Sequence, residues 1–387
     1  MALGWYCRFC YCYHSYGATG CAHPKTQDVT MLPASPHDKQ PNPLSLFEFW
    51  PRWVFYTPVV AYWILLGLRY RDVTLPTAAN PRITTGGLCG EKKSELLDMA
   101  GPYAQQWIAP YATFTTGSND LADATRAMRS KNLAFPVVVK PDIGCNGTGV
   151  KLVHTQEELA QVCASFPRNI SLVVQKLITW PHEAGLFYIR HPDEPTGRLT
   201  SLTYKDIPFL TGNGRDTVLD LLKQDVRTSK VLHIYTPRLQ HCLNTIPAKG
   251  ETLELVFAGN HCKGAVFRNG IPDITPELTA QIDRIMQDIP DFYFGRIDLK
   301  FRSVEDLSLG KNFEIIEING VGAEAIHIWD AKTTLREAYV AQFHHYRESY
   351  RIGAKNKAAG WKPTNLWHGL RLWRAQKKLL ASYPLND

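Results

Sequence analysis

The most constraining feature of the sequence is the stretch 135–153, which reads FPVVVKPDIGCNGTGVKLV. An apolar, β-branched run ends in Lys140, a loop with three glycines follows, and a second apolar run comes after it. This pattern predicts a β-hairpin with a flexible tip. Two interpretations are open at this point: a surface hairpin whose glycines supply positive φ angles, or a flap that closes over a polyphosphate. The loop is not a Walker A loop, because it lacks the G-K-[ST] ending.

A second pair of strands, expected at 292–302 and 313–320, carries three oxygen-bearing side chains. Because alternate side chains of a strand share a face, Glu317 and Asn319 project to one side, and Asp298 lies on the preceding strand. Three such ligands suit Mg²⁺ (or Mn²⁺), which keeps waters and bridges phosphates. A polar, solvent-facing sheet edge is the alternative for these strands alone. Lysine, glycine loop and acidic strands together favour the flap over a polyphosphate.

Composition limits the class of protein. A chain of 387 residues can form about two or three domains. The net charge of +7 is modest for this length, and no arginine-rich run with interleaved aromatic residues is present, so we do not expect nucleic-acid binding. Four of the nine cysteines lie within the first 21 residues and the others are scattered singly, which is typical of reduced thiols and a cytoplasmic protein.

The pattern along the chain predicts an α+β fold rather than a regular doubly wound sheet. The segments expected to be helical are 92–101, 120–133, 155–164, 217–225, 277–289 and 333–352. The expected strands are 112–116, 136–140, 149–153, 171–178, 186–190, 199–205, 251–257 and 264–270, besides the two acidic strands.

The N-terminal region differs from the rest of the chain. Residues 1–45 are interpreted as a disordered tail or the result of a wrong start, with Met31 as the alternative start and a zinc site as a weaker alternative. The longest uncharged run, 53–68, contains Pro58 and is shorter than the roughly 20 residues that span a bilayer. A buried helix is the favoured interpretation, an in-plane membrane contact is second, and a span is the weakest.

From about Lys92 to about Glu324, the order of these motifs resembles the ATP-grasp superfamily. KKSELLDMAG, FPVVVKP with its glycine loop, VVQKLITWPHE, GRID and EIN carry the resemblance, which is to D-alanine–D-alanine ligase and to the ATP-grasp parts of cyanophycin and glutathione synthetases. The fold implied is two α+β subdomains that grip ATP. The expected divisions are a short, aromatic, helix-rich N-terminal segment (46–117), a small subdomain (118–180), a large subdomain (181–330) and a basic helical extension (331–387).

The resemblance also implies roles for individual residues. The expected ATP-binding residues are Lys92 (with Lys93 as second choice), Lys140, Gly144, Gly147, Thr148, Gly149, Gln175, Lys176, Ile178 and Glu183. The expected catalytic residues are Arg296, Lys140 and Lys205, and the expected metal ligands are Asp298, Glu317 and Asn319. The expected substrate-binding residues are Arg190, Arg215, Arg268 and Glu324.

The activity implied is that of an ATP- and Mg²⁺-dependent ligase that joins a small-molecule carboxylate to an amine through an acylphosphate. A thiol or hydroxyl acceptor, a kinase, and a nucleotide-binding protein without catalysis are the alternatives, and a homodimer is left open. Two departures from the family leave the substrates undefined. The segment before the first lysine is short, and VGAEAIHIWD follows EIN where the D-alanine ligases have a serine- and proline-containing loop.

Overall fold

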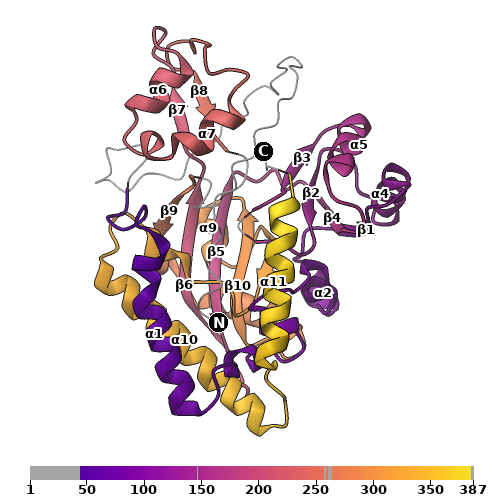
Figure 1. Ribbon diagram of the computed structural model, residues 1–387, viewed down its shortest axis with the longest axis vertical. Coiled ribbons are helices and arrows are strands. Elements are labelled where there is room, and N and C mark those ends of the chain that lie inside the picture. The colour runs from indigo at the N-terminus through magenta and orange to yellow at the C-terminus, as the bar shows by residue number, and fades with distance from the viewer. Residues whose placement is uncertain (1–43, 146, 257–258, 260–263, 385–387) are drawn as a thin grey trace.

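The expected α+β class is confirmed by the computed structural model, which describes residues 44–145, 147–256, 259 and 264–384. Two antiparallel sheets, each with its own helices, form two subdomains, and a third, two-stranded unit stands apart at the top of Figure 1. The expectations for residues 1–43, including their four cysteines and the zinc site, concern residues outside the described part of the chain.

The small subdomain is a four-stranded antiparallel sheet in the order β1-β4-β2-β3, built from β1 (Tyr111–Thr115), β4 (Ser171–Lys176), β2 (Val137–Pro141) and β3 (Lys151–Val153). Helices α4 (Asp120–Ser130) and α5 (Gln156–Ser165) pack on the face that carries Val137 and Val139. Because side chains alternate along a strand, Lys140 projects from the opposite face. Strand β1 lies before residue 118, where the sequence suggests a division, and it pairs with β4 along its whole length.

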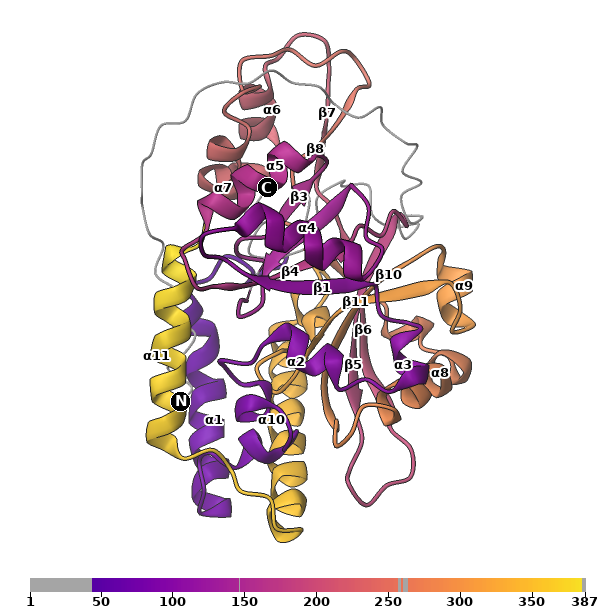
Figure 2. The same cartoon turned by 90° about the vertical axis from the view of Figure 1, so that its right-hand side faces the viewer.

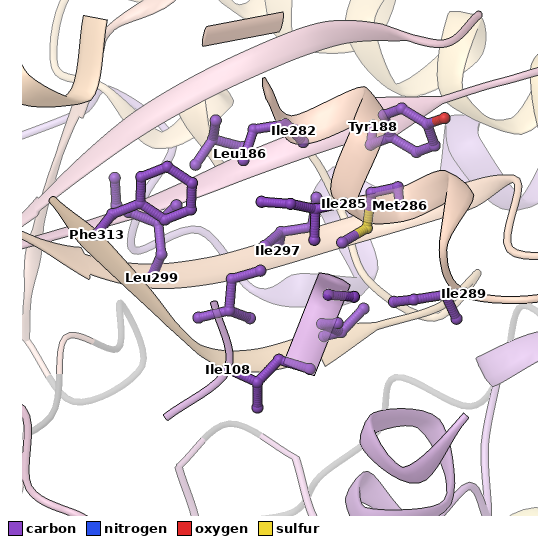
Figure 3. Close-up of a cluster of buried hydrophobic side chains, with 14 of the residues drawn as sticks. Ile108, Leu186, Tyr188, Ile282, Ile285, Met286, Ile289, Ile297, Leu299 and Phe313 are labelled. Carbon is purple, nitrogen blue, oxygen red and sulfur yellow. The ribbon is translucent and has the colours of Figure 1, made fainter. Parts of the chain in front are cut away.

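The large subdomain is a five-stranded antiparallel sheet in the order β11-β10-β5-β6-β9. Its strands are β5 (His182–Ile189), β6 (Arg198–Asp206), β9 (Val266–Asn269), β10 (Phe294–Phe301) and β11 (Phe313–Asn319). Helix α8 (Pro276–Gln287) covers one face, where Ile282, Ile285 and Met286 lie beside Leu186 and Ile297 in a buried cluster (Figure 3). The polar side chains of the same strands therefore gather on the other face.

Two helices from opposite ends of the chain cover part of that other face. Helix α1 (Arg52–Tyr70) packs along α10 (Leu335–Ala358), with the rings of Phe55 and Trp63 against Tyr339 and Tyr346 (Figure 1). The expected helix at 333–352 is thus confirmed and extends further. The last helix, α11 (Leu366–Ser382), runs from the large subdomain to the small one, where the hydroxyl group of Tyr383 donates to the carbonyl oxygen of Ile143 at 3.0 Å.

The two-stranded unit pairs β7 (Phe209–Thr211) with β8 (Thr252–Glu254) and carries α6 (Val218–Gln224) and α7 (Leu232–Arg238). The other short helices are α2 (Lys93–Asp98), α3 (Pro102–Gln105), α9 (Val304–Ser308), η2 (Leu75–Ala78), η3 (Thr84–Gly87), η4 (Thr228–Val231), η6 (Ile271–Asp273) and η7 (Ile326–Trp329). Among the described helices, none combines the length and the hydropathy that a bilayer span requires.

Candidate active site

The two subdomains meet at the side chain of Lys140. From β2 its Nζ donates to the carbonyl oxygen of Ile316 on β11 at 2.9 Å, and to Oε1 of Gln175 on β4 at 2.8 Å. Lys140 is buried, and burial lowers its pKa to about 8. In Figure 2 the strands of the small sheet cross those of the large sheet at this level. A lysine of the hairpin thus contacts the strand that carries the predicted metal ligands.

The polar side chains of β10 and β11 form the other half of the site. Asp298 and Glu317 are cross-strand partners, as are Arg296 and Asn319, so all four extend from the same face. The carboxylate of Asp298 contacts Nη2 of Arg296 at 3.0 Å and Nδ2 of Asn319 at 3.2 Å. Burial raises the pKa of Asp298, but Arg296 and Lys205 outweigh it and hold that pKa at about 2.

Lys205 connects this acid to the start of β5. Its Nζ lies 2.8 Å from Oδ1 of Asp298 and 2.9 Å from Oε1 of Glu183. Burial alone would lower the pKa of Lys205, but the two carboxylates raise it above its ordinary value. Gly185, which pairs with Asp298 on β5, lacks a side chain, and a Cβ there would lie 3.0 Å from Oδ1 of Asp298. The glycine therefore makes room for the charged cluster.

The lysine that enters this cluster from α2 is Lys93, the second of the two lysines considered from the sequence. Nζ of Lys93 donates to the carbonyl oxygen of Gly144 at 2.8 Å and lies 3.1 Å from Oε1 of Glu317. Lys92 is half exposed, and its Nζ lies 3.6 Å from Glu95. The physical reason is the way α2 docks, because Asp142 accepts from the backbone N–H and the hydroxyl group of Ser94 and so fixes the rotation of the helix.

The glycine loop follows directly after Lys140 and Asp142. Gly147 and Gly149 have φ angles of 66° and 74°, which favour glycine, whereas Gly144 does not have a positive φ. The backbone N–H of Thr148 donates to the carbonyl oxygen of Cys145, an exposed residue. Lys93 thus holds the carbonyl group of Gly144, near the start of this loop.

The segment that joins the two subdomains contains the residues expected to bind adenine. Gln175 and Ile178 are buried, and Gln175 accepts from Lys140 as described above. Lys176 is half exposed at its side chain, where Nζ lies 3.3 Å from Oε1 of Glu314. Glu183, another expected ATP-binding residue, lies close to Gly259, since a Cβ at residue 259 would be 3.0 Å from Oε1 of Glu183.

Three arginines expected at the substrate site lie elsewhere. Arg190 follows β5 at the end of the sheet away from Glu183, with its guanidinium group over the ring of Tyr293. Arg215 is exposed on a turn of the two-stranded unit. Arg268 pairs in register with Tyr204, beside Lys205, and therefore projects from the opposite face, where it binds Asp206.

Glu324 lies next to Arg296, whose Nη1 donates to its backbone carbonyl oxygen at 3.4 Å. Its side chain accepts hydrogen bonds from Tyr56 on α1 at 2.9 Å, from Trp329 at 2.9 Å and from Gln342 on α10 at 2.7 Å. None of these three donors is a cation, and within the described residues Glu324 has no ion-pair partner. A fixed carboxylate of this kind suits a positively charged group from a substrate.

Several residues of this cluster carry no signal in the sequence. Asp142 is almost fully buried and anchors both Ser94 and Ser171, but a lone aspartate after a strand reads as a turn residue. Tyr56 and Gln342 reach Glu324 from helices at opposite ends of the chain. Only the apolar pattern of 53–68 could have indicated that α1 packs against the site.

The metal expectation can be tested against the chemistry of the donors. Within the described residues, no group of three or more His, Cys, Asp and Glu side chains is placed to hold a metal ion. The protein offers two carboxylates, from Asp298 and Glu317, and the amide of Asn319. This oxygen set fits a hard cation that takes its remaining ligands from water and phosphate oxygens, as Mg²⁺ does.

Comparison with known proteins finds no matching family model and no significant match among curated proteins. Among solved structures, the chain is similar to the VanG D-Ala:D-Ser ligase of Enterococcus faecalis, with 14% identity, a TM-score of 0.39, and coverage of 68% of this chain and 64% of that one. It is also similar to the D-alanine–D-alanine ligase of Bacillus anthracis, with 12% identity, a TM-score of 0.41, and coverage of 72% and 73%. A third similar structure is a bifunctional glutathione synthetase of Pasteurella multocida, with 15% identity, a TM-score of 0.34, and coverage of 65% of this chain and 35% of that one.

Each of these TM-scores is below 0.5, so the fold is described from the arrangement of the elements within the chain. Two α+β subdomains face each other, and lysines beside the glycine loop of the small one contact the acidic strand of the large one. This arrangement is the one that the ATP-grasp resemblance implies for the chain. The α+β class expected from the sequence is confirmed, and the helical N-terminal segment packs on helix α10.

Proposed function

We propose that this protein is a Mg²⁺-dependent ligase of the ATP-grasp type that joins a carboxylate to an amine through an acylphosphate. The observation that carries the proposal is the convergence of three buried lysines on the acidic strands. Lys140 comes from the small subdomain, Lys93 from helix α2 and Lys205 from the large subdomain, and they contact Ile316, Glu317 and Asp298. Burying so many charges together is costly unless they serve a bound ligand, and such clusters are typical of functional sites.

ATP would lie between the two sheets. In this proposal Gln175, Lys176 and Ile178 line the adenine, and Glu183 accepts from the ribose hydroxyl groups. The phosphates would lie beneath the glycine loop, near Lys93 and Lys140. Within the chain these lysines interact with Glu317, the loop carbonyl of Gly144 and the carbonyl of Ile316, and the phosphate oxygens of ATP would replace these acceptors.

Asp298, Glu317 and Asn319 would hold Mg²⁺, which supplies positive charge beside the transferred phosphoryl group when bound. The side chains of the chain itself supply the rest. Lys93 and Lys140 would stabilise charge on the phosphate oxygens, and loop closure would exclude water from a readily hydrolysed acylphosphate. We assign Lys205 to this charge cluster as well, because it fixes both Glu183 and Asp298.

The reacting carboxylate and the amine would meet beside Arg296. Its guanidinium group, held by Asp298, would stabilise the oxyanion that forms when the amine attacks the acylphosphate. Glu324, next to Arg296, would bind the amine in its ammonium form, and its carboxylate would accept the proton that the nitrogen must lose before it attacks. In the described part of the chain, neutral donors hydrogen-bond its carboxylate, so a substrate ammonium group would form an ion pair with it.

The test measures ADP release from purified protein with panels of carboxylates and amines, and uses hydroxylamine to trap an acylphosphate as a hydroxamate. Active combinations should give ADP, phosphate and an amide. The variants Asp298→Asn and Glu317→Ala should lower the rate by a factor on the order of 10²–10³. Asp306→Asn, which affects only a surface ion pair at 3.7 Å from Arg302, is the matched control. Unchanged rates in both site variants, or a stable phosphorylated product without amide, would contradict the proposal.

A further inference from the structure

Exposed large hydrophobic side chains concentrate on and just before helix α1. Of the 13 such residues in the described part of the chain, seven lie between residues 46 and 68. They are Leu46, Phe49, Trp50, Trp53, Ile64, Leu65 and Leu68. Leu65 and Leu68 are 61% and 68% exposed, so they take no part in the core. An exposed apolar patch of this kind normally marks an interaction surface.

The outward face of α1 carries no charged residue between Arg52 and Arg69. The inward face packs Phe55, Val59 and Trp63 against α10. The outward residues from Trp53 to Leu68 include Thr57, Pro58 and Ala61, all uncharged, although a surface helix normally presents charged residues to water. Arginines stand at the two ends, with Arg52 before the stripe and Arg69 after it.

The same side of the molecule is strongly basic. Helix α11 has four exposed basic residues (Arg371, Arg374, Lys377 and Lys378), and neither α1 nor α11 contains an acidic residue. Both helices lie at the front of Figure 1 and along the left edge of Figure 2. Trp367, which is 72% exposed, lies near the start of α11. This side therefore combines an aliphatic stripe, exposed tryptophans and an excess of positive charge.

We propose that the α1–α11 side of the protein docks on an anionic phospholipid surface, with α1 lying in the plane of the membrane. Aliphatic side chains enter the interface, tryptophan prefers the headgroup level, and arginine and lysine bind anionic headgroups. A second copy of the chain fits less well, since pairing two α1 stripes would bring arginines together with no acid on either helix to balance them. A nucleic acid would leave Ile64, Leu65 and Leu68 without a partner.

The test is flotation of the full-length protein with vesicles of phosphatidylcholine, alone or with about one third phosphatidylglycerol. We expect flotation with the anionic vesicles, weaker binding to the neutral ones, and partial release at about 0.5 M salt. The double variant Leu65→Glu/Leu68→Glu should lower the partition coefficient by at least about a hundredfold. Lys377→Glu/Lys378→Glu should lower it by at least about thirtyfold.

Leu309→Glu is the matched control, because Leu309 is also an exposed leucine (54%) but follows α9 on the opposite side of the molecule in Figure 2. It should change the partition coefficient by less than about fivefold. Unfolding temperatures check that each variant is folded. Three results would overturn the proposal: no flotation at any phosphatidylglycerol content, flotation unaffected by the double leucine variant, or a dimer in solution that this variant dissociates while vesicles do not bind.

Discussion

Replacing Lys93 with methionine removes a cation that lies between the glycine loop and the acidic strand. Its Nζ is 2.8 Å from the carbonyl oxygen of Gly144 and 3.1 Å from Oε1 of Glu317, and its side chain is only 12% exposed. Under the proposed function this ammonium group contacts the ATP phosphates. Methionine keeps most of the side-chain volume, so the substitution tests the charge more than the packing.

The size of the effect follows from the environment of the side chain. A hydrogen bond to a charged group contributes about 1.5–3 kcal/mol, which corresponds to a rise of about 10- to 150-fold in the dissociation constant of a non-hydrolysable ATP analogue. Lys92 provides the matched control. It is 46% exposed and 3.6 Å from Glu95, so its ion pair contributes about 0–1 kcal/mol and Lys92→Met should weaken binding by less than about fivefold.

The assay is titration calorimetry of each variant with the Mg²⁺ complex of the analogue, a measurement that needs neither the acid nor the amine. Unfolding temperatures measured in parallel test whether Glu317, deprived of its nearest cation, destabilises the fold. Stronger weakening by Lys92→Met than by Lys93→Met, in two folded proteins, would refute the orientation of α2 described here. Equal, small effects would refute the assignment of a phosphate contact to either lysine.

Three further predictions concern titration, the loop and the backbone. Burial lowers the pKa of Lys140 to about 8, and bound phosphates would raise that pKa again, so analogue binding takes up a proton above pH 8. The affinity for the analogue should therefore fall by up to about tenfold per pH unit above pH 8, and an unchanged affinity at pH 9 would contradict this. Tyr383→Phe removes a donor from Ile143 at the base of the glycine loop, at a cost of about 1 kcal/mol, and should speed amide exchange there about fivefold, as measured by mass spectrometry. Gly87→Ala should lower the free energy of unfolding, measured by urea denaturation, by about 3 kcal/mol or more, because φ is 80° and a Cβ would lie 2.5 Å from Cα of Gly320. In the control Gly117→Ala, a Cβ would have no atom within 4 Å, and the free energy of unfolding should change by less than about 1 kcal/mol.

Some of the site could be predicted because its signal is local. Lys140 ends an apolar strand and a glycine loop follows it, so both belong to one hairpin whatever the rest of the chain does. Asp298 and Glu317 lie on strands close together in the sequence, and the alternation of side chains within each strand fixes which residues share a face. The structure brings these residues into contact across the two subdomains.

Other features of the site could not be predicted because they depend on long-range register or on how a helix docks. Lys92 precedes α2 with extended backbone and Lys93 is the first residue of the helix, and only the docking of Ser94 onto Asp142 places Lys93 beside Glu317. Arg268 could face either side of its sheet until the pairing of β9 with β6 aligned it with Tyr204. A slip of one residue in that register would have placed it on the face of Lys205.

The sequence by itself determined the α+β class, the hairpin with its glycine loop, and the strands that bear the acidic residues. Each of these depends on residues that are close along the chain, where side-chain periodicity and the conformational freedom of glycine act directly. Only the tertiary structure decided that Lys93 enters the site, that Tyr56 and Gln342 hold Glu324, and that α1 has an exposed, uncharged face. These outcomes depend on contacts between elements from 18 to 268 residues apart, which no local pattern specifies.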